Sequence, residues 1–469
     1  MVPVVSMQAK TVAVLGLSRT GRSVCRALRE GGARVWAWDD EPQRRVEAAS
    51  MGVPIVNLDI CNWQRVDRLI LSPGIPLRRP RPHRLVKRAT AAGIEISGDI
   101  ELLVENQPER RILGITGTNG KSTTAALVAE LLHRAGLGVQ LGGNIGLPVL
   151  DLLPKPVEDI YVLELSSYQL DLTNHLACAV AVILNLSPDH LERHGSMADY
   201  VAAKRRVLLN QSESDCAVIG VDDAHGEALF QELSTKGRQR VLPIAVGRQV
   251  ERGIAVIDGQ LYDALDGEPR PVIDLRPIAS LRGAHNWQNA AAAYGVVRAL
   301  GLAPAAAAAG MSEFHGLPHR MEPVAVIDGV QFVNDSKATN PDAAARALAS
   351  FDHIYWIAGG RAKQSGLEPV WPWLDRVEHA FLIGEAAAGF GEQLTGRVAF
   401  EQCGDLVTAV DHAAAAARQS AHPDAVVLLA PACASFDQFA DFEARGDAFK
   451  DLVEQQVPLR QAMAAGGRR

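Results

Sequence analysis

The chain has 469 residues, of which 48% are hydrophobic and 22% are charged, and its formal net charge is −7. One hydrophobic core stops growing well before this length, so the length predicts two to four domains. The composition is that of a globular protein, and the acidic balance argues against a nucleic-acid binder, which normally carries a basic field.

The cysteines, the N-terminal segment and the Ala-rich run of the chain indicate the cellular compartment. The six cysteines are scattered without a C-x-x-C pair, which favours reduced thiols over a disulfide framework or a zinc site. The segment 1–10 has no basic region followed by an apolar one, and Arg298 and Pro304 interrupt the Ala-rich run 290–310. We therefore expect neither an export signal nor a membrane span, and a cytoplasmic protein.

The first hundred residues begin like a nucleotide-binding βαβ unit. A strand at 11–17, a glycine turn at 16–21, a helix at about 20–31 and a strand at 33–39 follow in order. Asp39 ends the second strand, where a ribose would need an acid. Ser18 replaces the middle glycine of G-x-G-x-x-G, which argues against bound NAD; a βαβ unit without a ligand stays open. A further strand at 67–71 runs into the rigid turn 72–76.

The stretch 114–123 (GITGTNGKST) stands between an apolar strand and a long helical pattern. Glycines allow backbone N–H groups to converge on an anion, and the helix N-terminus adds partial positive charge. Lys121 would reach the β- and γ-phosphates, and the Ser122 hydroxyl would bind Mg²⁺. Ile115 stands where the strict P-loop pattern needs glycine. The stretch still predicts a nucleoside triphosphate site, the alternative being an ordinary strand-to-helix turn.

Polar residues end the strands that follow, expected at 138–146, 160–165 and 177–186. These are Asn144, Glu164 and the pair Asp189-His190. An acid at the end of an apolar strand is costly unless a positive group meets it. Glu164 is therefore predicted to share Mg²⁺ with Ser122, or else to pair with a Lys or Arg. His190 could be a metal ligand or a hydrogen-bonded turn residue.

Two further positions in the middle of the chain are ambiguous. A helix from 196 to about 210 carries Tyr200 and Lys204 four residues apart, hence on one face. The pattern alone predicts a solvated Lys204. After peripheral strands and loops at 212–281, residues 283–289 begin an Ala-rich helix. Asn286 there could bind a base edge or serve as an N-terminal turn residue.

The last third predicts another α/β unit. A hairpin at 324–333 runs into 334–341, a strand at 354–358 into 359–363, and a strand at 426–429 into 430–437. Strands that end in Gly, Ser and Lys on one sheet edge predict a second binding surface. The expected fold is α/β with mostly parallel sheets in three domains: a Rossmann-like domain at 1–106, a P-loop ATPase-type domain at 107–314 and a Rossmann-like domain at 315–469.

The motifs together resemble the Mur ligases. The matching stretches are TGTNGKST, ELSSYQL, NLSPDHL, LPHR, NDSKATN and PACASFDQF, which occur in the family's order between about residues 11 and 450. The first marks the wider group that includes folylpolyglutamate synthetase; 334–340 and 431–439 resemble more narrowly the member that adds D-glutamate.

The resemblance implies ATP-dependent ligation of D-glutamate to UDP-N-acetylmuramoyl-L-alanine in cytoplasmic peptidoglycan precursor synthesis, through an acyl phosphate and a tetrahedral intermediate. It implies two Mg²⁺ ions, a CO₂-derived carbamate on Lys204 and a monomer that binds small molecules, with no nucleic acid and no membrane.

The resemblance also implies roles for individual residues, which are grouped here by ligand. Catalysis falls to Lys121, His190 and Lys204. ATP would meet Gly117, Thr118, Asn119, Gly120, Lys121, Ser122, Thr123, Asn286, Arg320 and Asp335. The UDP substrate would meet Ser18, Arg19, Thr20, Asp39, Ser72, Gly74, Asn144 and His190. D-Glutamate would meet Lys337, Thr339, Lys363, Ser435 and Phe442. Metal would meet Ser122, Glu164, His190 and the carbamate on Lys204.

Three other functions stay open on the residues alone. A folylpolyglutamate synthetase shares the phosphate loop and would add L-glutamate to folate. An NAD-dependent dehydrogenase could be built on the first βαβ unit, although Ser18 argues against it. A regulatory P-loop ATPase would hydrolyse ATP without needing an amino acid.

Overall fold

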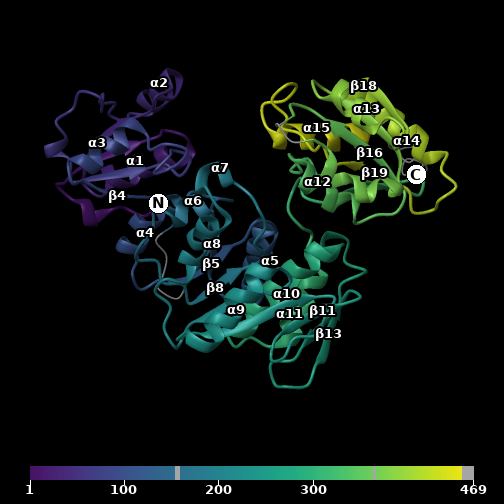
Figure 1. Ribbon diagram of the computed structural model, residues 1–469, viewed down its shortest axis with the longest axis horizontal. Helices are drawn as coiled ribbons and strands as arrows, with labels where there is room; N and C mark the ends of the chain where they lie inside the picture. The colour runs from purple at the N-terminus through teal and green to yellow at the C-terminus, as the bar shows by residue number, and fades with distance from the viewer. Residues whose placement is uncertain (154–158, 363–365, 457–469) are drawn as a thin grey trace, which may run out of the picture. The chain divides into compact units, whose positions relative to one another are not determined.

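The computed structural model describes residues 1–153, 159–362 and 366–456 and contains three sheets, each built mainly from parallel strands (Figure 1). The expectation of an α/β fold is therefore confirmed. Short 3₁₀ helices connect the longer elements: η1 (Val5–Met7), η2 (Trp63–Arg65), η3 (Val149–Asp151), η4 (Arg206–Leu208), η5 (Ala279–Leu281) and η6 (Glu368–Arg376).

The first sheet has four parallel strands in the order β2-β1-β3-β4. The strands are β1 (Thr11–Leu15), β2 (Arg34–Trp38), β3 (Arg68–Leu71) and β4 (Glu95–Ser97). The helices are α1 (Arg19–Glu30), α2 (Pro42–Ser50), α3 (Arg84–Ala91) and α4 (Asp99–Asn106). Every residue of β1 is buried because the strand lies inside the sheet, which explains why all of its residues after Thr11 are apolar.

The second sheet has nine strands in the order β13-β12-β11-β10-β9-β8-β5-β7-β6. They are β5 (Arg111–Thr116), β6 (Val139–Gly143), β7 (Ile160–Glu164), β8 (Val180–Ile183), β9 (Cys216–Gly220), β10 (Arg240–Val246), β11 (Ile254–Ile257), β12 (Gln260–Asp263) and β13 (Arg270–Asp274). The pairings of β12 with β11 and with β13 are antiparallel, and the other pairings between these strands are parallel. The prediction that 212–281 is peripheral is wrong for β9 and β10, which continue the parallel core.

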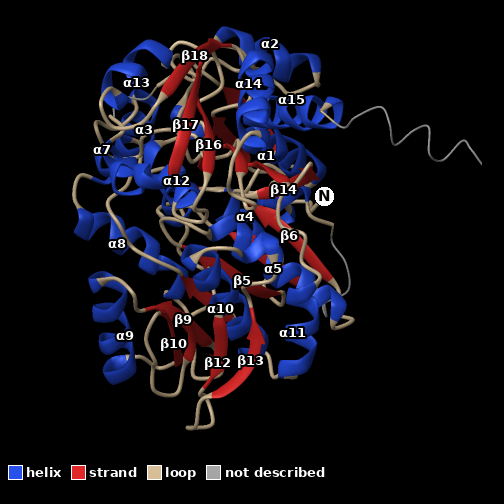
Figure 2. Cartoon of the chain, turned by 90° about the vertical axis from the view of Figure 1, so that its right-hand side faces the viewer, coloured by secondary structure: helices blue, strands red, loops and turns tan. Residues whose placement is uncertain are grey.

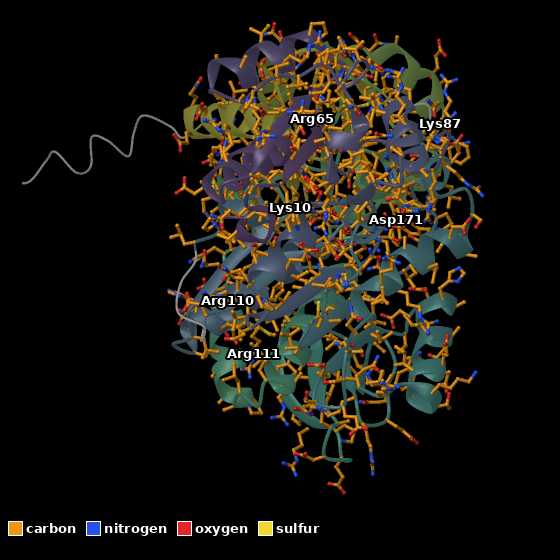
Figure 3. All side chains as sticks on the ribbon, turned by 90° about the vertical axis from the view of Figure 1, so that its left-hand side faces the viewer. Lys10, Arg65, Lys87, Arg110, Arg111 and Asp171 are labelled. Carbon is orange, nitrogen blue, oxygen red and sulfur yellow. The ribbon has the colours of Figure 1, made fainter. Side chains whose placement is uncertain are left out.

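Helices cover this second sheet on its flanks. They are α5 (Lys121–Arg134), α6 (Ser167–Leu170), α7 (Leu191–His194), α8 (Met197–Arg205), α9 (Ala224–Lys236), α10 (Ala284–Ala299) and α11 (Pro304–Ser312). Helix α9 packs on β9 and β10, and α11 packs on α5 and β13 (Figure 2). Arg110 immediately precedes β5, and the strand begins at the exposed Arg111 (Figure 3).

The third sheet has six strands in the order β14-β15-β19-β16-β17-β18, of which only β14 pairs antiparallel. They are β14 (Glu322–Ile327), β15 (Val330–Asn334), β16 (Ile354–Gly359), β17 (Val377–Ile383), β18 (Phe400–Gly404) and β19 (Val426–Leu429). Its helices are α12 (Pro341–Leu348), α13 (Ala387–Leu394), α14 (Leu406–Arg418) and α15 (Phe442–Gln455). Separate apolar clusters pack on its two faces, as expected for a doubly wound sheet.

The chain forms two compact units. The first contains Met1–Leu275 and Asn286–Glu313, hence the first two sheets; the second contains Arg276–His285 and Phe314–Arg469, hence the third sheet. The predicted domain limits at 106/107 and 314/315 remain predictions.

The cysteines are free thiols, and their pKa values are raised by burial. All six cysteines lie among the described residues and none forms a disulfide. Burial is the main cause that raises the pKa of each thiol, to about 12 for Cys25, Cys178 and Cys433. Across 1–153, 159–362 and 366–456, no helix combines the length and the hydropathy that a bilayer crossing requires.

Candidate active site

The turn after β1 needs two of its glycines. Gly16 has φ +95°, and a Cβ added there would lie 2.6 Å from the Ser72 Cβ. A Cβ on Gly21 would lie 1.8 Å from the Gly16 carbonyl oxygen. Ser18, by contrast, has φ −67° and is exposed, so a side chain costs no backbone strain there. The missing middle glycine therefore leaves the turn intact.

The phosphate loop between β5 and α5 is fixed by the loop that follows β8. Thr118 N donates to Asn185 O (2.8 Å), and Asn119 N donates to Asn185 Oδ1 (2.9 Å). The Lys121 Nζ donates to Gly117 O (3.1 Å) and Thr118 O (2.9 Å). These hydrogen bonds hold the loop as an ordered turn, and its lysine is folded back onto two of the loop's carbonyl groups.

Gly120 closes the loop against α10. It has φ +84°, and a Cβ there would lie 2.1 Å from Asn289 Oδ1, which also accepts a hydrogen bond from Thr124. Asn286 lies one turn before Asn289 on α10, is 4% exposed and accepts from the Asn289 amide (3.0 Å). Asn289 therefore supports the loop, and Asn286 holds the Asn289 side chain.

We expect Gly120→Ala to lower the free energy of unfolding by about 1–3 kcal/mol and to weaken ATP binding, because strain and a clash coincide there. Gly136→Ala is the matched control: it sits at the other end of α5 with a similar φ of +80°, and nothing lies within 4 Å of its Cβ. Urea unfolding and ATP titration of the two variants check this. Equal losses of ATP affinity would show that only backbone strain matters.

Glu164, at the end of β7, is 1% exposed and only partly satisfied. Its Oε1 accepts from Asn144 Nδ2 (2.7 Å), while its Oε2 is buried without a hydrogen-bond partner among the described residues. Glu164 is opposite Ile115 in the pairing of β7 with β5, the strand that leads into the phosphate loop. A buried carboxylate oxygen beside a phosphate loop fits a divalent cation, so the residues present suit Mg²⁺.

Lys204 differs from the sequence-based expectation. The prediction of a solvated lysine is wrong: Lys204 is 2% exposed, its Nζ donates to Gly117 O (2.7 Å), and it lies over the Tyr200 ring, 4.7 Å from the centroid. Burial, followed by the charge of Lys121, lowers the pKa of Lys204 well below its usual value. No local pattern reveals this burial, because it arises where α8 packs behind the phosphate loop.

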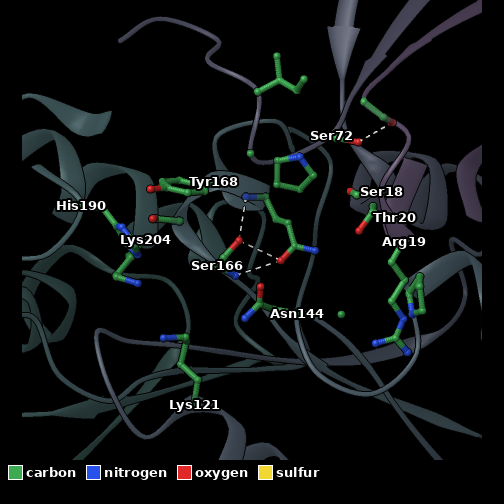
Figure 4. A pocket seen from close by; sticks show the side chains of 18 of the residues that line it. Ser18, Arg19, Thr20, Ser72, Lys121, Asn144, Ser166, Tyr168, His190 and Lys204 are labelled. Atoms are coloured by element: carbon green, nitrogen blue, oxygen red, sulfur yellow. Dashed lines mark hydrogen bonds between the residues drawn. The ribbon is translucent and has the colours of Figure 1, made fainter. Parts of the chain in front are cut away.

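A cavity of about 510 Å³ in the first unit brings Lys121, Asn144 and Lys204 together with Ser72 (Figure 4). From the first sheet it is lined by Gly16, Ser18, Arg19, Thr20, Arg44, Ser72, Pro73, Gly74 and Ile75. From the second sheet it is lined by Lys121, Gly143, Asn144, Pro148, Ser166, Ser167, Tyr168, Gln169, Asp189, His190, Tyr200 and Lys204. Arg19 joins the two walls by donating to Gly146 O (2.5 Å).

Two predicted residues have surroundings that the sequence does not reveal. His190 lines the cavity with a side chain that is 47% exposed, and its nitrogens lie 3.5 Å from an Asp189 oxygen and 3.7 Å from a Glu192 oxygen. Asp39 does not line the cavity: it is 4% exposed and accepts from Leu17 N (2.7 Å) and Glu41 N (2.9 Å). The carboxylate of Asp39 therefore orders the turn itself, and a direct substrate contact stays a prediction.

In the second unit, Asp335, Lys337 and Ser435 lie in the loops that follow β15 and β19. The Lys337 Nζ lies 3.5 Å from the centroid of the Phe442 ring, and Ser435 is 2% exposed. Burial raises the pKa of Asp335 to about 6, against the charge of Arg320. Thr339 lies two residues beyond Lys337, before α12. Lys363 lies outside the described residues.

Arg445 on α15 is a residue that the sequence reading missed. It is 1% exposed and donates to Ser336 O (2.9 Å), Ser336 Oγ (3.0 Å) and Cys433 O (3.1 Å). It thereby ties the loop after β15 to the loop after β19. Burial lowers its pKa to about 10. No local sequence pattern indicates this role, because the residues that Arg445 contacts lie 109 and 12 positions earlier in the chain.

We expect Arg445→Ala to lower the free energy of unfolding of the second unit by about 3–5 kcal/mol, because several buried oxygens lose their donor together. Arg397→Ala, an exposed arginine over the Trp371 ring, is the control and should change little. Thermal unfolding of the full chain measures both. A loss no larger than that of Arg397→Ala would exclude Arg445 as the main tie between these loops.

Comparison with known proteins identifies the class of protein. Residues 115–297 match the model for the Mur ligase middle domain, and residues 319–433 match that for the Mur ligase glutamate ligase domain. The chain therefore belongs to the Mur ligase family.

Individual relatives narrow the comparison further. UDP-N-acetylmuramoylalanine--D-glutamate ligase of Phenylobacterium zucineum is 50% identical over 99% of this chain and 100% of its own length. The protein of the same name from Rhodospirillum rubrum is 45% identical over 100% of this chain and 99% of its own. Among solved structures, the MurF ligase of Thermotoga maritima has a TM-score of 0.57 at 18% identity, over 97% of this chain and 98% of that one. MurC from the same organism has a TM-score of 0.56 at 17% identity, over 95% and 99%. At such identities the structures establish the shared fold alone.

Proposed function

We propose that this chain is an ATP-dependent ligase that joins D-glutamate to UDP-N-acetylmuramoyl-L-alanine in peptidoglycan precursor synthesis. The observation that carries the proposal is the cavity in which a phosphate-loop lysine, Lys121, faces the glycine turn and Ser72 of the first sheet. Full-length relatives that carry this activity in their names support the choice of substrates.

The chemistry requires activation of a carboxylate. An oxygen of the alanyl carboxylate attacks the γ-phosphorus of ATP, the bond to the β-phosphate oxygen breaks, and ADP leaves. The D-glutamate amine then attacks the acyl carbon and loses a proton, and the tetrahedral intermediate expels phosphate to leave the amide. No side-chain nucleophile is needed, so positioning and charge neutralisation carry the rate.

The residues of the cavity suit these tasks. Lys121 and the backbone N–H groups of 117–123 would hold the phosphates, with Asn286, Arg320 and Asp335 on the nucleotide. Ser18, Arg19, Thr20, Ser72 and Gly74 would hold the UDP part, with Asn144 and His190 beside the reacting end. Bound Mg²⁺ neutralises charge on the phosphoryl oxygens, and Ser122 and Glu164 would hold it. In the second unit, Lys337, Thr339, Ser435 and Phe442, with Lys363, would bind the dianionic amino acid.

We further propose a second Mg²⁺ held by His190 and a carbamate on Lys204. The neutral amine of Lys204 adds to CO₂ and loses a proton, which converts a buried cation into an anionic oxygen ligand of the type that Mg²⁺ prefers. The lowered pKa of Lys204 supports this step, because only the unprotonated amine reacts.

Phosphate release tests the proposed function. With ATP, Mg²⁺ and UDP-N-acetylmuramoyl-L-alanine, we expect phosphate only when D-glutamate is added, and none with L-glutamate. Release without any amino acid would indicate a plain ATPase, and release with L-glutamate and folate would indicate a folylpolyglutamate synthetase. We infer that the protein is cytoplasmic, because its reaction consumes ATP. The resemblance to the Mur ligases implies a monomer, and equilibrium sedimentation of the full chain would reveal a larger species.

A further inference from the structure

Two histidines and a carboxylate meet at the amino-terminal edge of the third sheet. His353 immediately precedes β16, Glu378 is the second residue of β17, and His422 lies in the loop before β19. Strands β19, β16 and β17 are adjacent and parallel, so their amino-terminal ends share one edge. The predicted amino-acid-binding loops, which follow β15, β16 and β19, leave the same sheet at its carboxyl edge.

The three side chains are in direct contact. His353 Nδ1 lies 2.8 Å from Glu378 Oε1, and His422 Nε2 lies 3.9 Å from the same oxygen. The two imidazole rings stack with centroids 3.5 Å apart and an interplanar angle of 7°. An Asp424 oxygen lies 4.0 Å from His353 Nε2 and adds a second negative charge.

Backbone geometry presents Glu378 to the histidines. In the pairing of β16 with β17, Ile354 is opposite Val377 while Tyr355 is opposite His379, so Glu378 is the extra residue of a β-bulge. Bulges re-aim a side chain and are frequent at sites. On the other side, Val426 N donates to His353 O (2.9 Å), which fixes β19 beside β16. The positions of His353 and Glu378 are therefore fixed by the strands of the sheet.

We propose that His353, His422 and Glu378 form a site for a divalent transition-metal ion, Zn²⁺ being the best match. One ligand atom from each residue lies within 4.8 Å of the others, and small side-chain rotations would bring them to the bond lengths of about 2.0–2.2 Å that Zn²⁺ requires. Two imidazole nitrogens with one carboxylate favour a borderline ion over Mg²⁺, which prefers a ligand set dominated by oxygen. The side chains are 27%, 45% and 38% exposed, so water can complete the coordination.

Two other groups in the described part of the chain offer similar residue types but fit less well. Glu401, Cys403 and His412 form one of them, but burial raises the pKa of the Cys403 thiol to about 11, and metals bind the thiolate. In the group Glu101, Glu105 and His175, Arg68 already neutralises Glu105 at 2.7 Å.

Zinc titration of the chelator-treated full chain, with excess Mg²⁺ present, tests the proposal by calorimetry. We expect one Zn²⁺ per chain, and His353→Ala, His422→Ala and Glu378→Gln should each weaken binding by at least roughly tenfold. His225→Ala removes an exposed histidine on α9 and is the matched control, with unchanged binding expected.

Further variants distinguish loss of the metal site from misfolding and from binding at the group Glu401, Cys403 and His412. His422→Cys should retain binding and give a Co²⁺ absorption spectrum with sulfur-to-metal charge transfer, which an unfolded or merely structural variant would not show. Three outcomes would each overturn the proposal. The wild type could show no saturable Zn²⁺ binding, or the double variant His353→Ala/His422→Ala could keep the wild-type affinity. The third is that binding is lost in Glu401→Gln/His412→Ala alone.

Discussion

Lys121→Ala is expected to lower turnover by roughly 10²- to 10³-fold, the usual cost of removing one electrostatic donor from a charged transition state. The side chain starts the first turn of α5 and lines the cavity, where its Nζ hydrogen-bonds to the carbonyls of Gly117 and Thr118. When the γ-phosphoryl group moves from ATP to the carboxylate, negative charge spreads over its oxygens, and a compact ammonium beside them stabilises that state.

The control for Lys121→Ala is the same substitution at a lysine elsewhere in the first unit. Lys236→Ala, at the exposed end of α9, removes the same charge without touching the loop and should leave turnover unchanged. Steady-state phosphate release measures both variants, and unfolding curves check that each is intact. Near-normal turnover of Lys121→Ala would remove this lysine from the phosphate site.

Lys204→Ala is expected to lower turnover by roughly 10²-fold or more, because the variant lacks the proposed anionic ligand. Acetate or formate should restore part of the activity, since either supplies carboxylate oxygens in the space that the side chain leaves. The ionisation of Lys204 gives a second signature. A lowered pKa leaves more of the amine neutral near pH 7, so ¹³CO₂ should give a carbamate NMR signal in the wild type.

Lys10→Ala provides the reference for these measurements, because Lys10 is exposed and lies away from the cavity. It should retain turnover and the carbamate signal. If no small carboxylate rescues Lys204→Ala at any concentration and the signal is missing from the wild type, the carbamate has no support, although the lysine could still matter as an amine.

Local patterns in the sequence predict the elements of the fold and the edge on which each site lies. The run 111–116 predicts β5, and the glycines with Lys121 predict the start of α5. Glu164 ends β7 as expected, and Asn144 directly follows β6, the neighbouring strand. Such features depend on residues close in the chain, where turn chemistry and hydrophobic periodicity act directly.

Features that depend on packing between distant segments do not appear in those patterns. Lys204 has the sequence surroundings of a solvated residue, yet α8 packs it behind the phosphate loop. Asp39 stands where a ribose ligand is expected, yet the turn itself takes both of its oxygens. Arg445 and the bulge at Glu378 depend likewise on contacts across the third sheet.

The sulfur chemistry of the chain limits how it can activate a carboxylate. No cysteine lines the cavity, and burial keeps the six thiols, all of them among the described residues, protonated at neutral pH. A thioester would need a nucleophilic thiolate within reach of the acyl carbon. None of the six thiols is therefore suited to carry the acyl group, and alkylating reagents or peroxide should leave the reaction untouched.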